Sequence, residues 1–98
     1  MSIVVFGGDC LGNIEKNLYS VGVTDLLHIT GRKPFTKSKN VIPKKTDLVL
    51  VLTDYLNHNT AKTVKLLAKE AEIPIVYAKR SWSSVEEKLK DGSYLKSI

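Results

Sequence analysis

A group of polar side chains directly follows the most apolar run of the sequence. The run is "LVLVLT" at residues 48–53, and the polar group within residues 53–59 is Thr53, Asp54, Tyr55, Asn57, His58 and Asn59. Asp54 or Asn57 could simply cap a helix, since Asx side chains accept hydrogen bonds from first-turn N–H groups. One cap does not need so many polar neighbours, so we interpret the junction as a candidate site. A histidine there can donate to an anion when protonated, or offer a lone pair to a metal when neutral.

A second candidate segment is "GGDCLG" at residues 7–12. Gly7 and Gly8 allow a positive φ or a close backbone approach, and Asp9 follows them. The spacing departs from G-x-G-x-x-G, and Arg32 stands where a dinucleotide site has an acidic residue, so a full NAD site is not expected. Cys10 lies near a predicted helix start, where a thiol ionises more readily; a small hydrophobic role beside the core is the alternative.

A third candidate segment is "KRSWSS" at residues 79–84. Arg80 suits a carboxylate or a phosphate, because its planar guanidinium matches both geometries. Ser81 and Ser83 could contact the same ligand, but Ser83 or Ser84 could also cap the helix that follows. No His, Cys or carboxylate pair in the chain has convincing metal-ligand spacing.

The elements that would position these segments alternate along the chain. Apolar and β-branched runs predict strands at 2–6, 25–30, 48–53 and 74–78, and the strand at 25–30 includes His28, which we interpret as a structural side chain. Helical spacing of apolar residues predicts helices at 11–21 and 58–72 and a last helix that begins at Ser83-Ser84 and ends at Asp91-Gly92. The predicted buried stripe of the second helix is Ala61, Val64, Leu67, Ala68 and Ala71.

This alternation predicts one α/β domain over residues 1–98, with a small open parallel sheet of four strands in the order 2-1-3-4 and a three-layer, Rossmann- or flavodoxin-like arrangement. Ligands of such sheets bind outside the carboxyl ends of the strands. We therefore expect the candidate segments to converge on that edge. The predicted ligand-binding residues are Gly7, Gly8, Asp9, Thr53, Asp54, Asn57, His58, Arg80, Ser81 and Ser83.

Length and composition indicate the size of the core, the oligomeric state and the cellular location that we expect. The chain has 98 residues, of which 43% are hydrophobic, enough for one modest core that a partner subunit would help to cover. We expect a homodimer, with Trp82 and Tyr94 near its contact; Trp82 and Tyr55 could instead flank a planar ligand. No apolar run is long enough to span a membrane, the start lacks a secretory signal, and Cys10 is the only cysteine, so we expect a cytoplasmic protein without membrane contact.

The net charge of +5 favours anionic partners. Much of it lies in the long connection that precedes the third strand, where the basic residues are Arg32, Lys33, Lys37, Lys39, Lys44 and Lys45. Nucleic-acid binding through this loop rests on charge alone, and a solvated loop explains the run equally well. We expect only weak, non-specific binding of nucleic acid.

Taken together, "VVFGGD" and "DLVLVLTDYLNHNTAKTVKLLAKEAEIPIVYAKRSWSSVEEKL" resemble the bacterial domain of unknown function 2325 over most of the chain. The resemblance implies a cytoplasmic Rossmann-like domain, and its motif match points to His58 and Arg80. It also leaves open a haem-binding or gas-sensing role in which His58 is the axial ligand. In length, and in having a cysteine after the first strand, the chain is also similar to the IIB phosphocarriers of sugar phosphotransferase systems.

These observations lead us to expect a ligand-binding, sensor or accessory module rather than an enzyme. Its ligand would be small and anionic, with phosphate or nucleotide character. One alternative is the haem protein with His58 as its ligand. The other is a phosphocarrier-like enzyme that uses Cys10.

Overall fold

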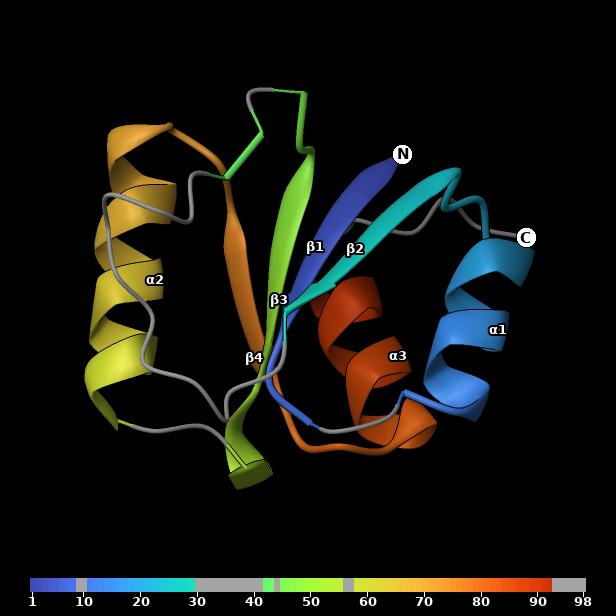
Figure 1. Ribbon diagram of the computed structural model, residues 1–98. Coiled ribbons are helices and arrows are strands. Elements are labelled where there is room, and N and C mark those ends of the chain that lie inside the picture. The colour runs from blue at the N-terminus through green and yellow to red at the C-terminus, as the bar shows by residue number, and fades with distance from the viewer. Residues whose placement is uncertain (9–10, 30–41, 44, 56–57, 93–98) are drawn as a thin grey trace.

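The computed structural model describes residues 1–8, 11–29, 42–43, 45–55 and 58–92. Its strands β1 (Ser2–Phe6), β2 (Asp25–Ile29), β3 (Leu48–Leu52) and β4 (Ile75–Ala78) form one all-parallel sheet in the order β2-β1-β3-β4. Helix α2 (His58–Glu70) covers one face, and helices α1 (Asn13–Ser20) and α3 (Trp82–Asp91) cover the other (Figure 1). The predicted fold class and strand order are confirmed.

The strand β3 is buried along its whole length because it has a strand on either side and helices on both faces. Its leucines at 48, 50 and 52 belong to the core cluster beneath α1 and α3, and its valines at 49 and 51 belong to the cluster beneath α2. The continuous apolar run therefore reflects a central parallel strand, as predicted. All four strands run from the top to the bottom of Figure 1, so their carboxyl ends meet at the lower edge.

The starts of two helices differ from the prediction. Helix α1 begins at Asn13 rather than at residue 11, because Gly12 precedes it with a positive φ of 54°, while Leu11 is buried ahead of the helix. Helix α3 begins at Trp82, with Ser81 as its N-cap, so the predicted start at Ser83-Ser84 is wrong.

The buried stripe of α2 is narrower than predicted. Val64, Leu67 and Ala68 are buried, and Ala61 is half-buried. Ala71 is exposed because α2 ends at Glu70, which leaves Ala71 in the turn before β4. Among the residues that the structure describes, no helix is long and apolar enough to cross a membrane.

Candidate functional site

The turn after β1 contains two glycines in left-handed conformations. The N–H of Gly7 continues the sheet by donating to the carbonyl of Ile29 at 2.9 Å, and φ is 99° at Gly7 and 75° at Gly8. A Cβ atom on Gly7 would lie 2.6 Å from the carbonyl oxygen of Leu52, closer than two such atoms can approach. Position 7 therefore requires glycine for both its backbone angle and its space, as the predicted close approach implies.

The side chain of Arg80 lies against this turn. A Cβ atom on Gly8 would be 3.5 Å from Nε and 3.6 Å from Cδ of Arg80, which is ordinary van der Waals contact. Gly8 follows β1 and Arg80 follows β4, so strand ends on both sides of β3 contribute to one place. A guanidinium presents five N–H donors in a rigid plane, which allows it to serve more than one partner.

The end of β3 is joined to the end of β4 through Asp54 and Thr53. An Oδ2 atom of Asp54 accepts a hydrogen bond from the backbone N–H of Arg80 at 3.3 Å, and the Thr53 hydroxyl donates to the carbonyl of Ala78 at 3.3 Å. Both residues lie in a short 3₁₀ turn, Thr53–Tyr55, directly after β3. Asp54 is therefore part of the connection that places Arg80.

Serine side chains organise the turn from β4 into α3. The Ser81 hydroxyl caps the helix by accepting from the N–H of Ser84 at 3.3 Å, and the Ser84 hydroxyl accepts from the N–H of Lys79 at 3.1 Å. The hydroxyls of Ser81 and Ser83 lie 3.5 Å apart. The capping role assigned to Ser83 or Ser84 from the sequence is thus wrong, because the N-cap is Ser81, two residues before Ser83.

Several backbone donors at this edge have no hydrogen-bond acceptor among the described residues, and they include the N–H groups of Gly8, Trp82 and Ser83. The last two lie in the first turn of α3, where the helix leaves N–H groups unpaired and its dipole favours an anion. Gly8 is buried, and a buried N–H without an acceptor is rare in proteins.

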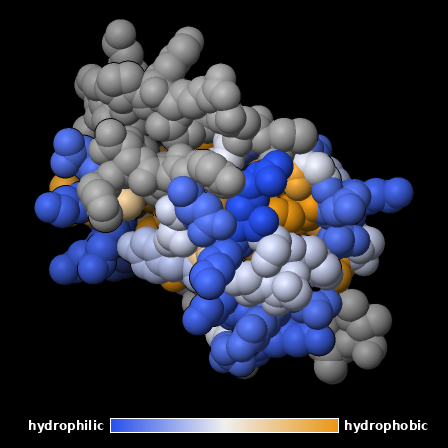
Figure 2. Space-filling view, turned by 90° about the horizontal axis from the view of Figure 1, so that it is seen from below, coloured by the Kyte–Doolittle hydropathy of each residue, from blue (hydrophilic) through white to orange (hydrophobic). Residues whose placement is uncertain are grey.

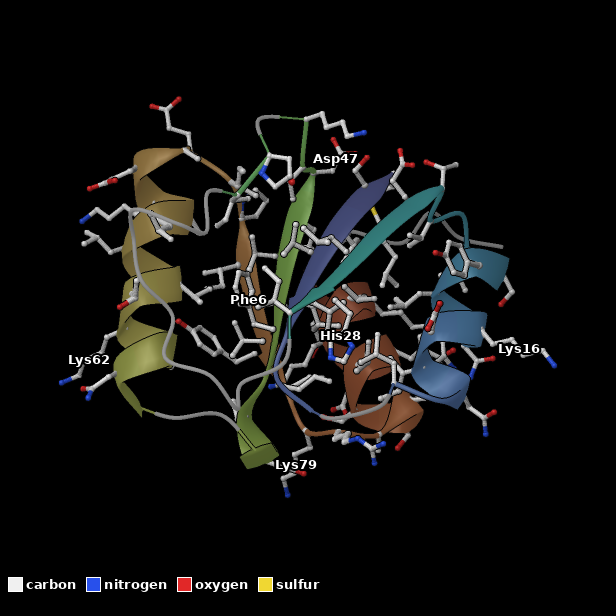
Figure 3. All side chains as sticks on the ribbon, in the orientation of Figure 1. Phe6, Lys16, His28, Asp47, Lys62 and Lys79 are labelled. Atoms are coloured by element: carbon white, nitrogen blue, oxygen red, sulfur yellow. The ribbon has the colours of Figure 1, made fainter. Side chains whose placement is uncertain are left out.

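The ring of His28 holds the glycine turn from the neighbouring strand. Its Nε2 lies 2.8 Å from the carbonyl oxygen of Gly7 and 3.1 Å from that of Gly8. Figure 3 shows the ring beside β2, on the side of the sheet that α1 and α3 cover. His28 lies within the strand, as predicted, but its contact with the candidate site was not predicted. The parallel pairing of β1 with β2 was the available signal, because it places His28 opposite Val5, two residues before the turn.

Seven of the ten predicted site residues are described in full, and all seven lie at the carboxyl edge of the sheet. They are Gly7, Gly8, Thr53, Asp54, Arg80, Ser81 and Ser83. The predicted convergence of Gly8, Asp54 and Arg80 is confirmed by the contacts above. Asp9 and Asn57 lie outside the described residues, as does Cys10. His58 is the first residue of α2, and its side chain and that of Tyr55 also lie outside the description.

Two further predictions concern Trp82 and the basic loop. Trp82 is half-buried and packs against the core cluster beneath α1 and α3, so much of its surface is used within the chain. Of the basic loop, Lys45 is described and is exposed, whereas Arg32, Lys33, Lys37, Lys39 and Lys44 lie outside the described residues. Within the described ranges no three His, Cys, Asp or Glu side chains are grouped as metal ligands.

Figure 2 views the molecule onto this edge. Hydrophilic side chains occupy the middle of the face, with a small apolar area beside them. A hollow of about 290 Å³ lies at the opposite end of the sheet, between the starts of β1 and β2 and residues Pro43, Lys45 and Thr46. Its lining holds none of the predicted ligand-binding residues, so the hollow and the polar cluster are separate features.

Comparison with known proteins places the chain in a family. Neither a curated relative nor a solved structure matches it. A family model described as "Uncharacterized protein conserved in bacteria (DUF2325)" matches residues 2–91, nearly the whole chain. The resemblance identified from the sequence is thereby confirmed, and the chain belongs to this bacterial family.

Proposed function

We propose that this chain is a small binding module that recognises an anionic ligand, of phosphate or nucleotide character, at the carboxyl edge of its sheet. In this proposal it serves as a sensor or accessory module rather than as an enzyme. The observation that supports it most is the position of the Arg80 side chain against Gly8, at the ends of strands on both sides of β3. A guanidinium beside the glycine turn brings a bidentate donor next to the N–H of Gly8.

Backbone donors and overall charge support the same ligand class. The N–H groups of Gly8, Trp82 and Ser83 have no acceptor among the described residues, and two of them are at the N-terminus of α3. Backbone N–H groups at a helix N-terminus are a common binding place for phosphate. The net charge of +5 would raise the local concentration of anions around the whole molecule.

Calorimetric titration with ATP, pyrophosphate and inorganic phosphate at fixed ionic strength tests the proposal. We expect at least one of them to bind, and we expect Arg80→Gln to weaken it by roughly 10- to 100-fold, the usual value of hydrogen bonds to a charged group. Arg80→Lys should recover part of the loss, because it restores the charge without the planar fork.

Lys62→Gln is the matched control. It removes one positive charge, as Arg80→Gln does, but from an exposed position on α2 that points away from the sheet (Figure 3). Its affinity should stay within about twofold of wild type, as expected for a screened surface charge. Equal losses in both variants, or no binding of any of the three anions, would contradict the proposal.

Each alternative function that the sequence suggests has its own experiment. A Soret shift on addition of haemin that is lost in His58→Ala would favour a haem protein over a protein that binds a phosphate-like anion. A phosphoryl group on Cys10, found by intact-mass spectrometry and absent from Cys10→Ser, would favour the phosphocarrier-like enzyme. Tight binding of a nucleic-acid duplex at physiological salt would favour the basic loop as the binding surface, since such binding normally weakens steeply with salt.

We also propose that the chain acts in the cytoplasm as a homodimer. The two edge strands of the open sheet support the dimer, because each carries an exposed apolar or aromatic side chain. Leu27 on β2 is 46% exposed, and Tyr77 on β4 is 39% exposed. An edge strand also presents backbone groups that another chain can pair with.

A further inference from the structure

We infer that His28 is a positioning residue for the candidate site, because its ring fixes the direction in which the Gly8 N–H is presented. The expected effect on ligand binding rests on the proposed function. The expected effect on the backbone of the glycine turn does not.

The sheet places His28 where its ring can reach this turn. In the parallel pairing of β1 and β2, Val5 is opposite His28 and Phe6 is opposite Ile29. Val5 and Leu26 both pack in the cluster beneath α1 and α3, and side chains two residues apart on a strand share a face, so His28 lies on that face too. The ring is half-buried there, and its Nε2 contacts the carbonyls of both glycines.

The contacts determine which ring nitrogen carries a proton. A carbonyl oxygen can only accept a hydrogen bond, so an Nε2 atom that lies 2.8 Å and 3.1 Å from two carbonyl oxygens must be the donor. In a neutral ring the proton is then on Nε2 and the lone pair is on Nδ1. One donor shared between the two oxygens ties both peptide groups to a rigid side chain.

The direction of the Gly8 N–H follows from this tie. The peptide bond between Gly7 and Gly8 is trans, so the N–H of Gly8 points opposite to the carbonyl of Gly7. Since that carbonyl is directed at His28, the N–H is directed away from it. Glycine visits positive and negative φ almost equally, so a Gly-Gly peptide can rotate unless something holds it. His28 supplies that restraint at the peptide whose N–H lacks an acceptor among the described residues.

Two substitutions separate a positioning role from a merely structural one. His28→Gln keeps an amide N–H at a comparable distance along the side chain and can donate to the same carbonyls. His28→Leu keeps an apolar side chain on the same face, beside Leu26, but has no donor. A role in core packing alone would make the two variants differ in stability without changing the backbone of the turn.

The experiment combines NMR of the full chain with a pyrophosphate titration. In the wild type we expect long-range ¹H–¹⁵N spectra to show His28 with its proton on Nε2. We expect His28→Leu to shift the Gly8 amide resonance strongly, to speed its hydrogen exchange and to lower pyrophosphate affinity by about tenfold, the value of one hydrogen bond to a charged ligand. His28→Gln should retain all three properties to within about twofold in affinity.

Two results would overturn the role of His28. One is a neutral His28 with its proton on Nδ1, which also decides the matter if His28→Leu does not fold. The other is a folded His28→Leu whose Gly8 resonance and pyrophosphate affinity match those of the wild type. If the wild type binds none of ATP, pyrophosphate and inorganic phosphate, the proposed function fails, but the tautomer and the Gly8 amide still test the positioning role.

Discussion

The carboxylate of Asp54 holds the backbone N–H of Arg80 at 3.3 Å, across 26 positions of sequence. The bond ties the turn after β3 to the turn after β4. Because the main chain of Arg80 makes it, the bond places the residue without using the guanidinium. Asp54 thus positions the cation that lies against Gly8.

Asp54→Ala should loosen this connection. We expect a loss of about 1 kcal/mol in the free energy of unfolding, the usual value of one hydrogen bond, and faster hydrogen exchange at the Arg80 amide. Asp54→Asn retains an acceptor oxygen and should lose less in both measurements. Urea unfolding and amide exchange of the three proteins check this, and an unchanged Arg80 amide in Asp54→Ala would contradict it.

Alanine at the two glycines should have unequal effects. Both positions have a positive φ, which costs a residue with a Cβ about 1–3 kcal/mol. Gly7→Ala adds the collision with the Leu52 carbonyl, whereas a Cβ at Gly8 meets Arg80 and Leu52 only at ordinary contact distances. Thermal unfolding should therefore show Gly7→Ala to be clearly the less stable variant. Equal stabilities would mean that the close approach at Gly7 is not maintained.

The N-cap of α3 can be tested with neighbouring serines. Ser81→Ala should lower the free energy of unfolding by about 0.5–2 kcal/mol, because the N–H of Ser84 loses its acceptor. Ser83→Ala is the control, since among the described residues the Ser83 hydroxyl makes only the 3.5 Å contact with the Ser81 hydroxyl. Denaturant unfolding of both variants measures the difference, and a larger loss in Ser83→Ala would restore the cap position expected from the sequence.

The proposed dimer has a direct test in solution. Light scattering at high micromolar concentration should give twice the chain mass. Leu27→Lys and Tyr77→Lys place a charge on one edge strand each, and the variant that yields the monomer identifies the strand at the contact. A monomeric wild type would contradict the dimer.

The strand order and the residues at the carboxyl edge were predictable because they follow from patterns within short segments of the sequence. The uninterrupted apolar run at β3 marks a central parallel strand, and alternating strands and helices leave few topologies. Gly7, Asp54 and Arg80 then had to lie at one edge of the sheet, since each follows the end of a strand within two residues. The start of α3 was not predictable from capping patterns, because Ser83 and Ser84 each begin a capping box, with Glu86 and Glu87, whereas the helix is capped by Ser81.

The contact of His28 with the glycine turn was harder to foresee. It depends on the register between β1 and β2, and a histidine within a strand gives no sign of what its ring reaches along the sheet. Which backbone N–H groups lack an acceptor at the carboxyl edge of the sheet also depends on tertiary hydrogen bonds. Sequence patterns therefore located the candidate site but did not predict which of its side chains and backbone groups contact one another.

The most direct test of an anionic ligand at this edge is a ¹H–¹⁵N titration of the wild-type chain at constant ionic strength with whichever of ATP, pyrophosphate and inorganic phosphate binds most tightly. We predict that the largest saturable shifts occur at the amides of Gly8, Arg80, Trp82 and Ser83 and at the Arg80 side chain. Amides on the outer face of α2, such as Lys62, should not move. Shifts that are absent, that do not saturate, or that centre on another surface would contradict the account.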